Sequence, residues 1–235
     1  MPEYAGPIRI ANIALALCLV LPLPAAAWVP EDVAVYETGG YDTELALRRP
    51  LAQQGDAGAQ FILGFMYGHG HGVLQDDSGS VYWYRKAAEQ GHAGAQNNLG
   101  LMYDRGEGVP EDDRQATSWY RKAAEQGHVS AQYNLAMNYR SGLGVPQDYK
   151  QSVYWYRKAA EQGDADAQFS VGVMYDRGHG VPKDYVLAHM WFNLAAAQGD
   201  ENGMKSRDSI ASGMTPSQIE KAQDLAREWL AAHPN

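Results

Sequence analysis

The chain has 235 residues, a single cysteine and a formal net charge of −9 at pH 7. So acidic a chain is a poor candidate for binding nucleic-acid phosphates or anionic lipid, because both carry charge of the same sign. The charge suits a basic partner or serves solubility alone. The length allows one domain with a sizeable core.

The first 27 residues differ in kind from the rest. Residues 10–23 form an uncharged, mostly apolar run, which is too short to span a bilayer. Arg9 precedes this run, and alanines at 25–27 supply the small residues of a signal-peptidase site. The pattern predicts a signal peptide over residues 1–27, and hence a mature chain that is periplasmic or secreted.

We expect cleavage between Ala27 and Trp28, after which the mature chain would not insert into a membrane. Cys18 would leave with the signal, so the mature chain could form no disulfide. Two alternatives stay open. The apolar run could remain as an uncleaved membrane anchor, and translation could begin downstream of Met1, because the front region carries little net positive charge. Residues 28–41 have the pattern of an irregular lead-in.

Residues 42–58 are predicted to form one helix, the lone second half of an incomplete repeat. Its apolar residues Leu47, Leu51 and Ala52 fall in the register of the second helices described below. Pro50 should kink this helix or mark its true start. A terminal unit of this kind is typical of a cap, which hides one face of an array and exposes a soluble one.

From residue 59 the sequence repeats itself. The dipeptide Ala-Gln begins at residues 59, 95, 131 and 167, a constant step of 36 residues. A fixed period of this kind indicates stacked supersecondary units, which bury a continuous core and present long binding surfaces. The period divides the chain into four repeats, at 59–94, 95–130, 131–166 and 167–202.

The first half of each repeat has the pattern of an amphipathic helix, as the second repeat shows. Ala95, Leu99, Met102 and Tyr103 fall on one helical face. Gly106 then provides a residue that tolerates a positive φ after a helix. The loop that follows contains a proline, which cannot continue a helix. The apolar face must therefore be buried against a neighbouring helix.

The second half of each repeat predicts another helix. Asp112 is expected to be its N-cap, with Gln115 completing a capping box. The helix carries alanines and an aromatic pair on one face and stops before Gly127. Aromatic residues at this spacing are expected to pack in the core. The pair recurs as Trp83-Tyr84, Trp119-Tyr120, Trp155-Tyr156 and Trp191-Phe192.

The combined pattern AQxxLGxMYxxGxGVPxDxxxAxxWYRKAAEQG resembles the Sel-1-like repeat, a relative of the tetratricopeptide repeat. The resemblance covers residues 59–202 as four repeats, of which the fourth has WFNLAAAQG in place of WYRKAAEQG. The tetratricopeptide period is 34 residues, and the extra length here lies in the glycine-rich loop. The resemblance implies an all-α fold, a right-handed α–α superhelix (a solenoid) of helix-turn-helix repeats, used for protein–protein interaction.

Residues 203–235 are predicted to form C-terminal capping helices. Thr215, Pro216 and Gln218 supply an N-cap, a proline at the first helical position and a capping-box glutamine. The helix that follows has apolar residues on one side and charged residues on the other. This amphipathic pattern suits a helix that closes the end of an array.

The sequence lacks the motifs of nucleophilic and nucleotide-dependent enzymes. It contains no Gly-x-Ser-x-Gly elbow, no Ser-x-x-Lys and no Walker motif. His69, His71 and His179 lie in the predicted interhelix loops, where exposed loop histidines are a more common explanation than a metal site. Carboxylates recur with the scaffold, so no catalytic pair stands out. We therefore predict no catalytic residue, no metal site and no cofactor.

A partner would bind along the first helices, which commonly line the concave side of a solenoid. Apolar and aromatic side chains there would suit an extended peptide or a partner helix. Packing between adjacent repeats is the alternative explanation for the same side chains. The candidate partner-binding residues occupy the second, sixth or ninth position after a repeat's first alanine: Phe61, Phe65, Asn97, Leu101, Asp104, Tyr133, Met137, Arg140, Phe169, Val173 and Asp176.

These observations favour a non-catalytic interaction module in the bacterial cell envelope, acting as a scaffold, adaptor or regulator. It would bind a protein or peptide on its concave face, would not bind nucleic acid, and would be a monomer or a weak oligomer. Two alternatives stay open. One is a cell-wall-directed or β-lactam hydrolase of the Sel-1-like type, and the other is a purely structural envelope component.

Overall fold

The computed structural model describes residues 40–233, which form helices and loops without a strand. The predicted all-α fold class is confirmed for this part of the chain. The predicted signal peptide, its cleavage site and residues 28–39 of the predicted lead-in lie outside the described residues. The helices are α2 (Tyr41–Gln53), α3 (Ala57–His69), α4 (Asp77–Glu89), α5 (Ala93–Arg105), α6 (Asp113–Glu125), α7 (Val129–Ser141), α8 (Tyr149–Glu161), α9 (Ala165–Arg177), α10 (Tyr185–Ala197), α11 (Glu201–Ala211) and α12 (Pro216–Ala232).

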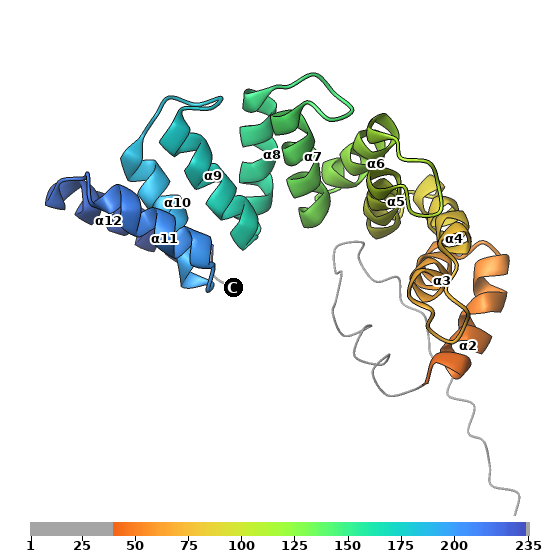
Figure 1. Ribbon diagram of the computed structural model, residues 1–235. Helices are drawn as coiled ribbons and strands as arrows, with labels where there is room; N and C mark the ends of the chain where they lie inside the picture. Colours follow the sequence, from red (N-terminus) through yellow and green to blue (C-terminus); the bar gives the residue numbers. More distant parts are fainter. Residues whose placement is uncertain (1–39, 234–235) are drawn as a thin grey trace, which may run out of the picture.

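The helices pack in sequence order as pairs along a curved array (Figure 1). The two helices of one repeat, such as α5 and α6, pack on each other, and the second of them packs on the first helix of the next repeat. The array begins with α2 against α3 and ends with α11 and α12, both of which pack on α10. Every repeat therefore buries its apolar faces against its sequence neighbours, as expected of a solenoid.

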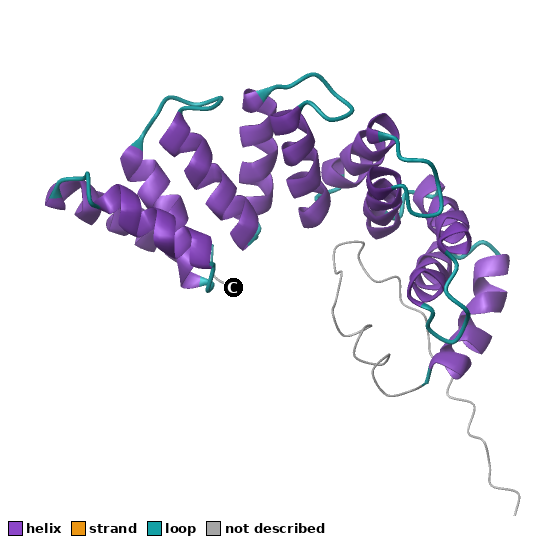
Figure 2. Cartoon of the chain, viewed as in Figure 1, coloured by secondary structure: helices purple, strands orange, loops and turns teal. Residues whose placement is uncertain are grey.

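The loop inside each helix pair depends on two glycines with positive φ. Gly106, with φ +67°, ends α5, and the amide of Glu107 donates to the carbonyl of Met102 over 3.0 Å. Gly108 has φ +68° and lies so close to the backbone of Asp77 that a Cβ would collide with it. The loop of one repeat thus rests on the first turn of the preceding repeat's second helix. In Figure 2 the loops of the α7–α8 and α9–α10 pairs follow the outer rim of the arch.

Asp112 caps α6 as predicted, but the predicted capping box does not form. The Asp112 carboxylate accepts hydrogen bonds from the backbone amides of Arg114 and Gln115 at 2.9 and 3.0 Å. The backbone amide of Asp112 already donates to the carbonyl of Tyr103 over 2.9 Å, so it is not available to the Gln115 side chain. The Gln115 part of the prediction is wrong. The capping box predicted at the start of α12 is formed.

The second residue of each aromatic pair lies at the centre of its repeat. Tyr120 is 1% exposed, whereas Trp119 is half-buried. The Tyr120 ring covers Gly100 of α5, where a Cβ would lie 2.7 Å from the ring, so glycine allows the two helices to approach. The predicted core role is confirmed for the second residues, which are Tyr84, Tyr120, Tyr156 and Phe192, and also for Trp191, which is 4% exposed.

Helix α2 forms an incomplete repeat at the beginning of the array. Ala52 is buried against α3, but Leu47 and Leu51 are 61% and 44% exposed. Within residues 40–233 no helix precedes α2, so nothing there covers these two leucines. Pro50 lies inside α2, which begins at Tyr41. The alternative in which Pro50 marks the start of the helix is therefore wrong.

Helix α11 takes the place of the first helix in a fifth, incomplete repeat. Gly203 and Met204 lie one period after the last Ala-Gln dipeptide, and the Asp200 carboxylate accepts a hydrogen bond from the Gly203 amide. Trp229 of α12 packs on Trp191 of α10 with ring centroids 6.0 Å apart. The two terminal helices thus cover the last complete repeat.

None of the helices between residues 40 and 233 combines the length and the apolar character that crossing a membrane requires.

Candidate interaction surfaces

The first helices of the pairs, α3, α5, α7 and α9, form one row of the array, which we call the inner face. Helix α3 contacts α5 directly. The side-chain amide of Asn134 in α7 donates to the side-chain oxygen of Asn97 in α5 over 3.2 Å. In a curved array the row whose members approach one another lies on the concave side. The second helices, α4, α6, α8 and α10, form the outer face.

The predicted partner-binding residues all lie on the inner-face helices, and none is fully exposed. Asn97 is buried, with 5% of its surface exposed, because it contacts Asn134 and its neighbour Asn98. Each of the others keeps part of its surface in solvent. These half-buried residues are Phe61, Phe65, Leu101, Asp104, Tyr133, Met137, Arg140, Phe169, Val173 and Asp176.

The aromatic members of this set pack on the core as well as facing solvent. The Phe61 ring stacks on His92 with centroids 4.5 Å apart and an interplanar angle of 22°. Tyr133 lies 5.5 Å from the buried Tyr156 ring, and Phe169 makes the equivalent contact in the next repeat. These rings therefore cover the core with one side and offer the other edge to a partner. Packing and binding are compatible at these positions.

A partly buried carboxyl group lies within repeat 2. Burial raises the pKa of Asp104 above its usual value, the nearby Asp113 raises it further, and Arg105 opposes both. Burial also raises the pKa of the Tyr120 hydroxyl, and Asp104 adds to that effect. A partner group that carries positive charge or donates a hydrogen bond would be favoured at Asp104, because it would stabilise the partly desolvated carboxylate.

A hollow of about 400 Å³ opens between repeats 1 and 2. It includes Leu101 from the predicted set, together with Asn98 and Arg105 of α5. The other residues that line it come mainly from α3, α4 and the two interhelix loops. The repeat positions selected on the first helices do not include these residues. The polar residues that sequence analysis missed there are Gln75, Asp77, Ser80, Tyr84 and Glu107.

The loop histidines have packing partners. His71 stacks on Tyr41 with centroids 4.4 Å apart, and His179 stacks on Tyr149 at 4.6 Å, three periods further along the chain. The His69 and His71 rings lie 5.6 Å apart. Over residues 40–233 no group of three or more His, Cys, Asp or Glu side chains could hold a metal ion. The stacked rings brace a loop against the preceding repeat.

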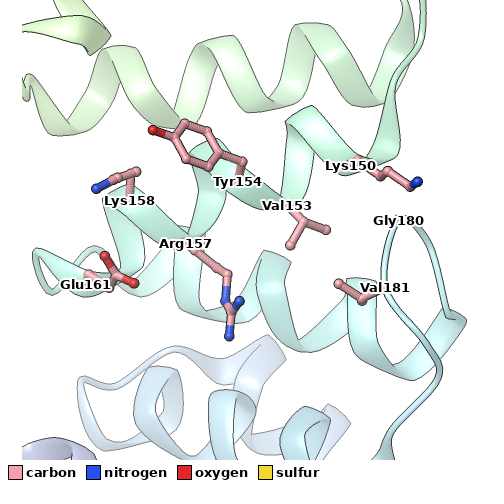
Figure 3. A pocket seen from close by; sticks show the side chains of 8 residues that line it. All are labelled: Lys150, Val153, Tyr154, Arg157, Lys158, Glu161, Gly180 and Val181. Carbon is pink, nitrogen blue, oxygen red and sulfur yellow. The ribbon is translucent and has the colours of Figure 1, made fainter.

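A second hollow, of about 430 Å³, lies on the outer face beside α8 (Figure 3). The loop between α9 and α10 forms one edge of it, and in Figure 3 Val181 of this loop lies close to Val153 of α8. Sequence analysis did not select these residues, because residues that recur with the scaffold were interpreted as structural. The lining residues are Lys150, Val153, Tyr154, Arg157, Lys158, Glu161, Gly180 and Val181.

Helix pairs stacked in sequence order, with a long row of half-buried side chains along the first helices, define an α-solenoid repeat protein. The Sel1 repeat model matches residues 57–92, 93–128, 129–164 and 165–200, which is more than half of the chain. The chain therefore belongs to the Sel1 repeat family, and the resemblance inferred from its sequence is confirmed.

Solved structures of related proteins share this architecture. A Sel1 repeat protein from Oxalobacter formigenes has 34% sequence identity and a TM-score of 0.73, over 87% of this chain and 85% of that one. The protective antigen c5321 of uropathogenic Escherichia coli strains, which displays an SLR fold, has 33% identity and a TM-score of 0.51. That match covers 80% of this chain and 48% of c5321, so this chain spans about half of its length. A comparison with curated proteins gives no match.

Proposed function

We propose that this chain is a non-catalytic protein-binding module, a scaffold, adaptor or regulator that holds a partner along its inner face. The observation that carries the proposal is the variation of half-buried residues on a constant scaffold. One repeat position, half-buried in each copy, changes from Phe65 to Leu101 to Met137, whereas the buried alanines and the aspartates before the second helices recur. A residue that only stabilised the fold would be expected to be the same in every repeat. Membership of the Sel1 repeat family, whose members generally bind protein partners, supports the same function.

The inner face suits a peptide or helix that crosses several repeats. Aromatic edges at Phe61 and Tyr133 offer apolar contacts, and the hollow between repeats 1 and 2 can take one side chain. Asp104, Arg140 and Asp176 alternate in sign along the face, so a partner with the complementary order of charges would bind in a defined register. Such a surface gains its affinity from a few desolvated contacts and its specificity from the charges.

Affinity capture from an envelope extract tests the proposal. Tyr133 also packs against the core, so truncating it changes the fold and the surface together. We therefore favour the charge variant Asp104→Lys/Arg140→Glu, with Arg114→Glu/Lys122→Glu on the outer face as control. The inner variant should lose partners that the control retains, and circular dichroism should show equal helix content. Retention of every partner by the inner variant would contradict the assignment.

Activity measurements test the hydrolase alternative. Purified protein should leave β-lactams and peptidoglycan fragments unchanged. Turnover could instead remain with the protein through a second purification step and be absent from a mock preparation. That result would contradict the non-catalytic function and favour an enzymatic one. Light scattering of the same preparation should show a monomer or a weak oligomer.

We also propose that the mature chain works in the periplasm or outside the cell. The support is the apolar run at residues 10–23 followed by small residues at 25–27. Cell fractionation with N-terminal sequencing tests this location. A mature N-terminus at Trp28 is the expected result. Full-length protein that stays in the membrane fraction would favour the anchor alternative instead.

A further inference from the structure

Three cationic side chains of α8 surround an apolar centre on the outer face. Lys150 precedes Arg157 and Lys158 by seven and eight residues, or two helical turns, so their backbones are separated by about 10–12 Å at 1.5 Å per residue. Val181 and the exposed Tyr154 ring lie between them, as Figure 3 shows, whereas the third apolar residue of the lining, Val153, is buried. The surface therefore presents positive charge at both ends and apolar side chains in the middle.

The cations at this place have few partners of their own. In the preceding repeat Arg121 donates to the hydroxyl of Tyr139 over 2.8 Å, and Arg85 makes the same bond one repeat earlier. Tyr175 holds the equivalent position for Arg157, and its ring centre lies at the same 5.8 Å from the guanidinium carbon as in the pair of Arg121 and Tyr139, but no hydrogen bond joins the two side chains. Within residues 40–233 the Arg157 side chain forms no hydrogen bond or ion pair. Its donors are available to a ligand.

The two lysines are likewise uncommitted in the described part of the chain. Lys150 forms no ion pair there, and Lys158 makes only a long contact with the ring of Tyr154, 5.9 Å from its centroid. Glu161, near the end of the row, forms no ion pair with them. A carboxylate can therefore bind these cations without breaking an existing ion pair.

The combination is particular to this repeat. Helix α4 lacks the first cation, α6 lacks the apolar and aromatic residues, and α10 lacks both cations of the second turn. The residues that stand in their places are Ser78 for Lys150, Thr117 and Ser118 for Val153 and Tyr154, and Asn193 and Leu194 for Arg157 and Lys158.

We propose that the hollow beside α8 is a second binding site, which takes an acidic peptide segment with two carboxylates on either side of apolar residues. An extended peptide advances about 3.3 Å per residue and its side chains alternate between two faces, so carboxylates four positions apart share a face and span about 13 Å. That distance is close to the separation of about 12 Å between Lys150 and Lys158 along the helix. The apolar side chain midway between the carboxylates lies on the same face and meets Val181 and the Tyr154 ring.

Charge also favours a short acidic peptide over a long polyanion. The chain has a net charge of −9, and Glu161 closes one end of the site. A polyanion that extended beyond the three cations would therefore meet like charge. This second site does not rest on the function proposed for the inner face, and it would let the chain hold two partners at once.

Fluorescence anisotropy with a labelled peptide tests the proposal. The probe is acetylated, amidated Gly-Glu-Leu-Leu-Leu-Glu-Gly, and its control has Gln in place of both Glu residues. We expect saturable binding of the probe and binding at least tenfold weaker for the Gln peptide. Binding should weaken as salt is added, because exposed charges are screened. Equal affinity for the two peptides, or no saturation at millimolar protein, would overturn the proposal.

Two charge-matched variants locate the site. Lys150→Glu/Lys158→Glu should weaken probe binding at least tenfold, whereas Arg114→Glu/Lys122→Glu, at the same positions one repeat earlier, should change it less than twofold. All four side chains are exposed, so both variants should keep the wild-type helix content. An equal loss in the two variants would show a general charge effect and overturn the site. Displacement of the probe by substoichiometric heparin would instead assign the site to a polyanion.

Discussion

The side-chain amide of Gln126, at the end of α6, donates a hydrogen bond of 2.7 Å to the side-chain oxygen of Gln96 in α5. Gln96 is buried, and its own amide donates to the carbonyl of Ala88 in α4 over 3.0 Å. One glutamine therefore joins three consecutive helices. The same bond recurs in the other repeats, between Gln90 and Gln60, Gln162 and Gln132, and Gln198 and Gln168.

The first prediction separates the two members of this pair. Gln96→Leu removes two hydrogen bonds at once, the one to the Ala88 carbonyl, which keeps the amide of Gly91, and the one from Gln126, and should lower the free energy of unfolding by ~1–2 kcal/mol. Gln126 is exposed, so water can replace its bond, and Gln126→Ala should cost less than ~1 kcal/mol. Urea denaturation followed by circular dichroism measures both. Equal losses would show that the bond from Gln96 to the Ala88 carbonyl contributes little beyond the bond between Gln126 and Gln96.

A second prediction compares two glycines with similar backbone conformation. Gly144 has φ +66° and Gly163 has φ +91°. A Cβ at Gly144 would collide with the backbone of Asp113, whereas a Cβ at Gly163 would meet nothing within 4 Å. Gly163→Ala should therefore cost only the ~1–2 kcal/mol of a left-handed residue, and Gly144→Ala clearly more. The change in melting temperature reports the difference, and a smaller effect at Gly144 would contradict the close approach of the loop.

Much of the fold could be predicted because its signals are local. Glycine after a helix, aspartate before one and aromatics at helical spacing act within a few residues, and each recurs every 36 residues. The bond between Gln126 and Gln96 was not predictable in the same way. The sequence shows that both residues recur, but their meeting depends on how α6 folds back on α5. The capping box at Gln115 fails for a similar reason. The backbone amide of Asp112, which would donate to the Gln115 side chain in such a box, donates to a carbonyl of the preceding helix instead.

The candidate sites were predictable only in outline. The period selects positions on the inner face, but it does not show that Asn97 is buried by a bond from α7 or that the Tyr133 ring packs on the core. The outer hollow was missed for a related reason. Arg157 occurs in the same motif as Arg121, and only the packed structure shows that Arg121 donates to a tyrosine hydroxyl whereas Arg157 does not.

Two histidines predict a dependence of stability on pH. The Nδ1 atoms of His92 and His128 accept hydrogen bonds from the amides of Ala95 and Ala131 at 3.1 and 3.3 Å, which a protonated ring cannot do. Burial lowers the pKa of both histidines below the ordinary 6.5. Between the lowered pKa and 6.5 the unfolded chain binds more protons, so this stability is present above pH 6.5 and is lost as the pH falls below it.

The matching variant is His92→Asp/His128→Asp, because Asp56 and Asp164 provide the same cap in other repeats. Urea denaturation at several values between about pH 5 and pH 8 should show a shallower loss of stability on acidification than in the wild type. His233→Asn, at an exposed position in the last turn of the chain, should keep the wild-type profile. An unchanged profile in the double variant would show that other groups cause the dependence.

A buried polar pair in the middle of the array provides a further test. Asn138 in α7 donates to the hydroxyl of Thr117 in α6 over 2.7 Å, and that hydroxyl donates to the carbonyl of Leu143 over 3.1 Å. Both side chains are buried. At the same positions the adjacent interfaces between repeats have apolar pairs, which are Val81 with Met102 and Val153 with Met174.

A double-mutant cycle should therefore show strong coupling between these two positions. Thr117→Val leaves the buried Asn138 amide without its acceptor, and Asn138→Met removes a donor from the hydroxyl, so each change should lower the free energy of unfolding by ~1–3 kcal/mol. The double variant restores the apolar pair of the neighbouring repeats and should lie within ~1 kcal/mol of the wild type, because replacing both partners leaves no buried polar side-chain atom unsatisfied. Additive losses in urea denaturation would contradict this coupling, and would mean that the backbone around Leu143 had already adapted to the polar pair.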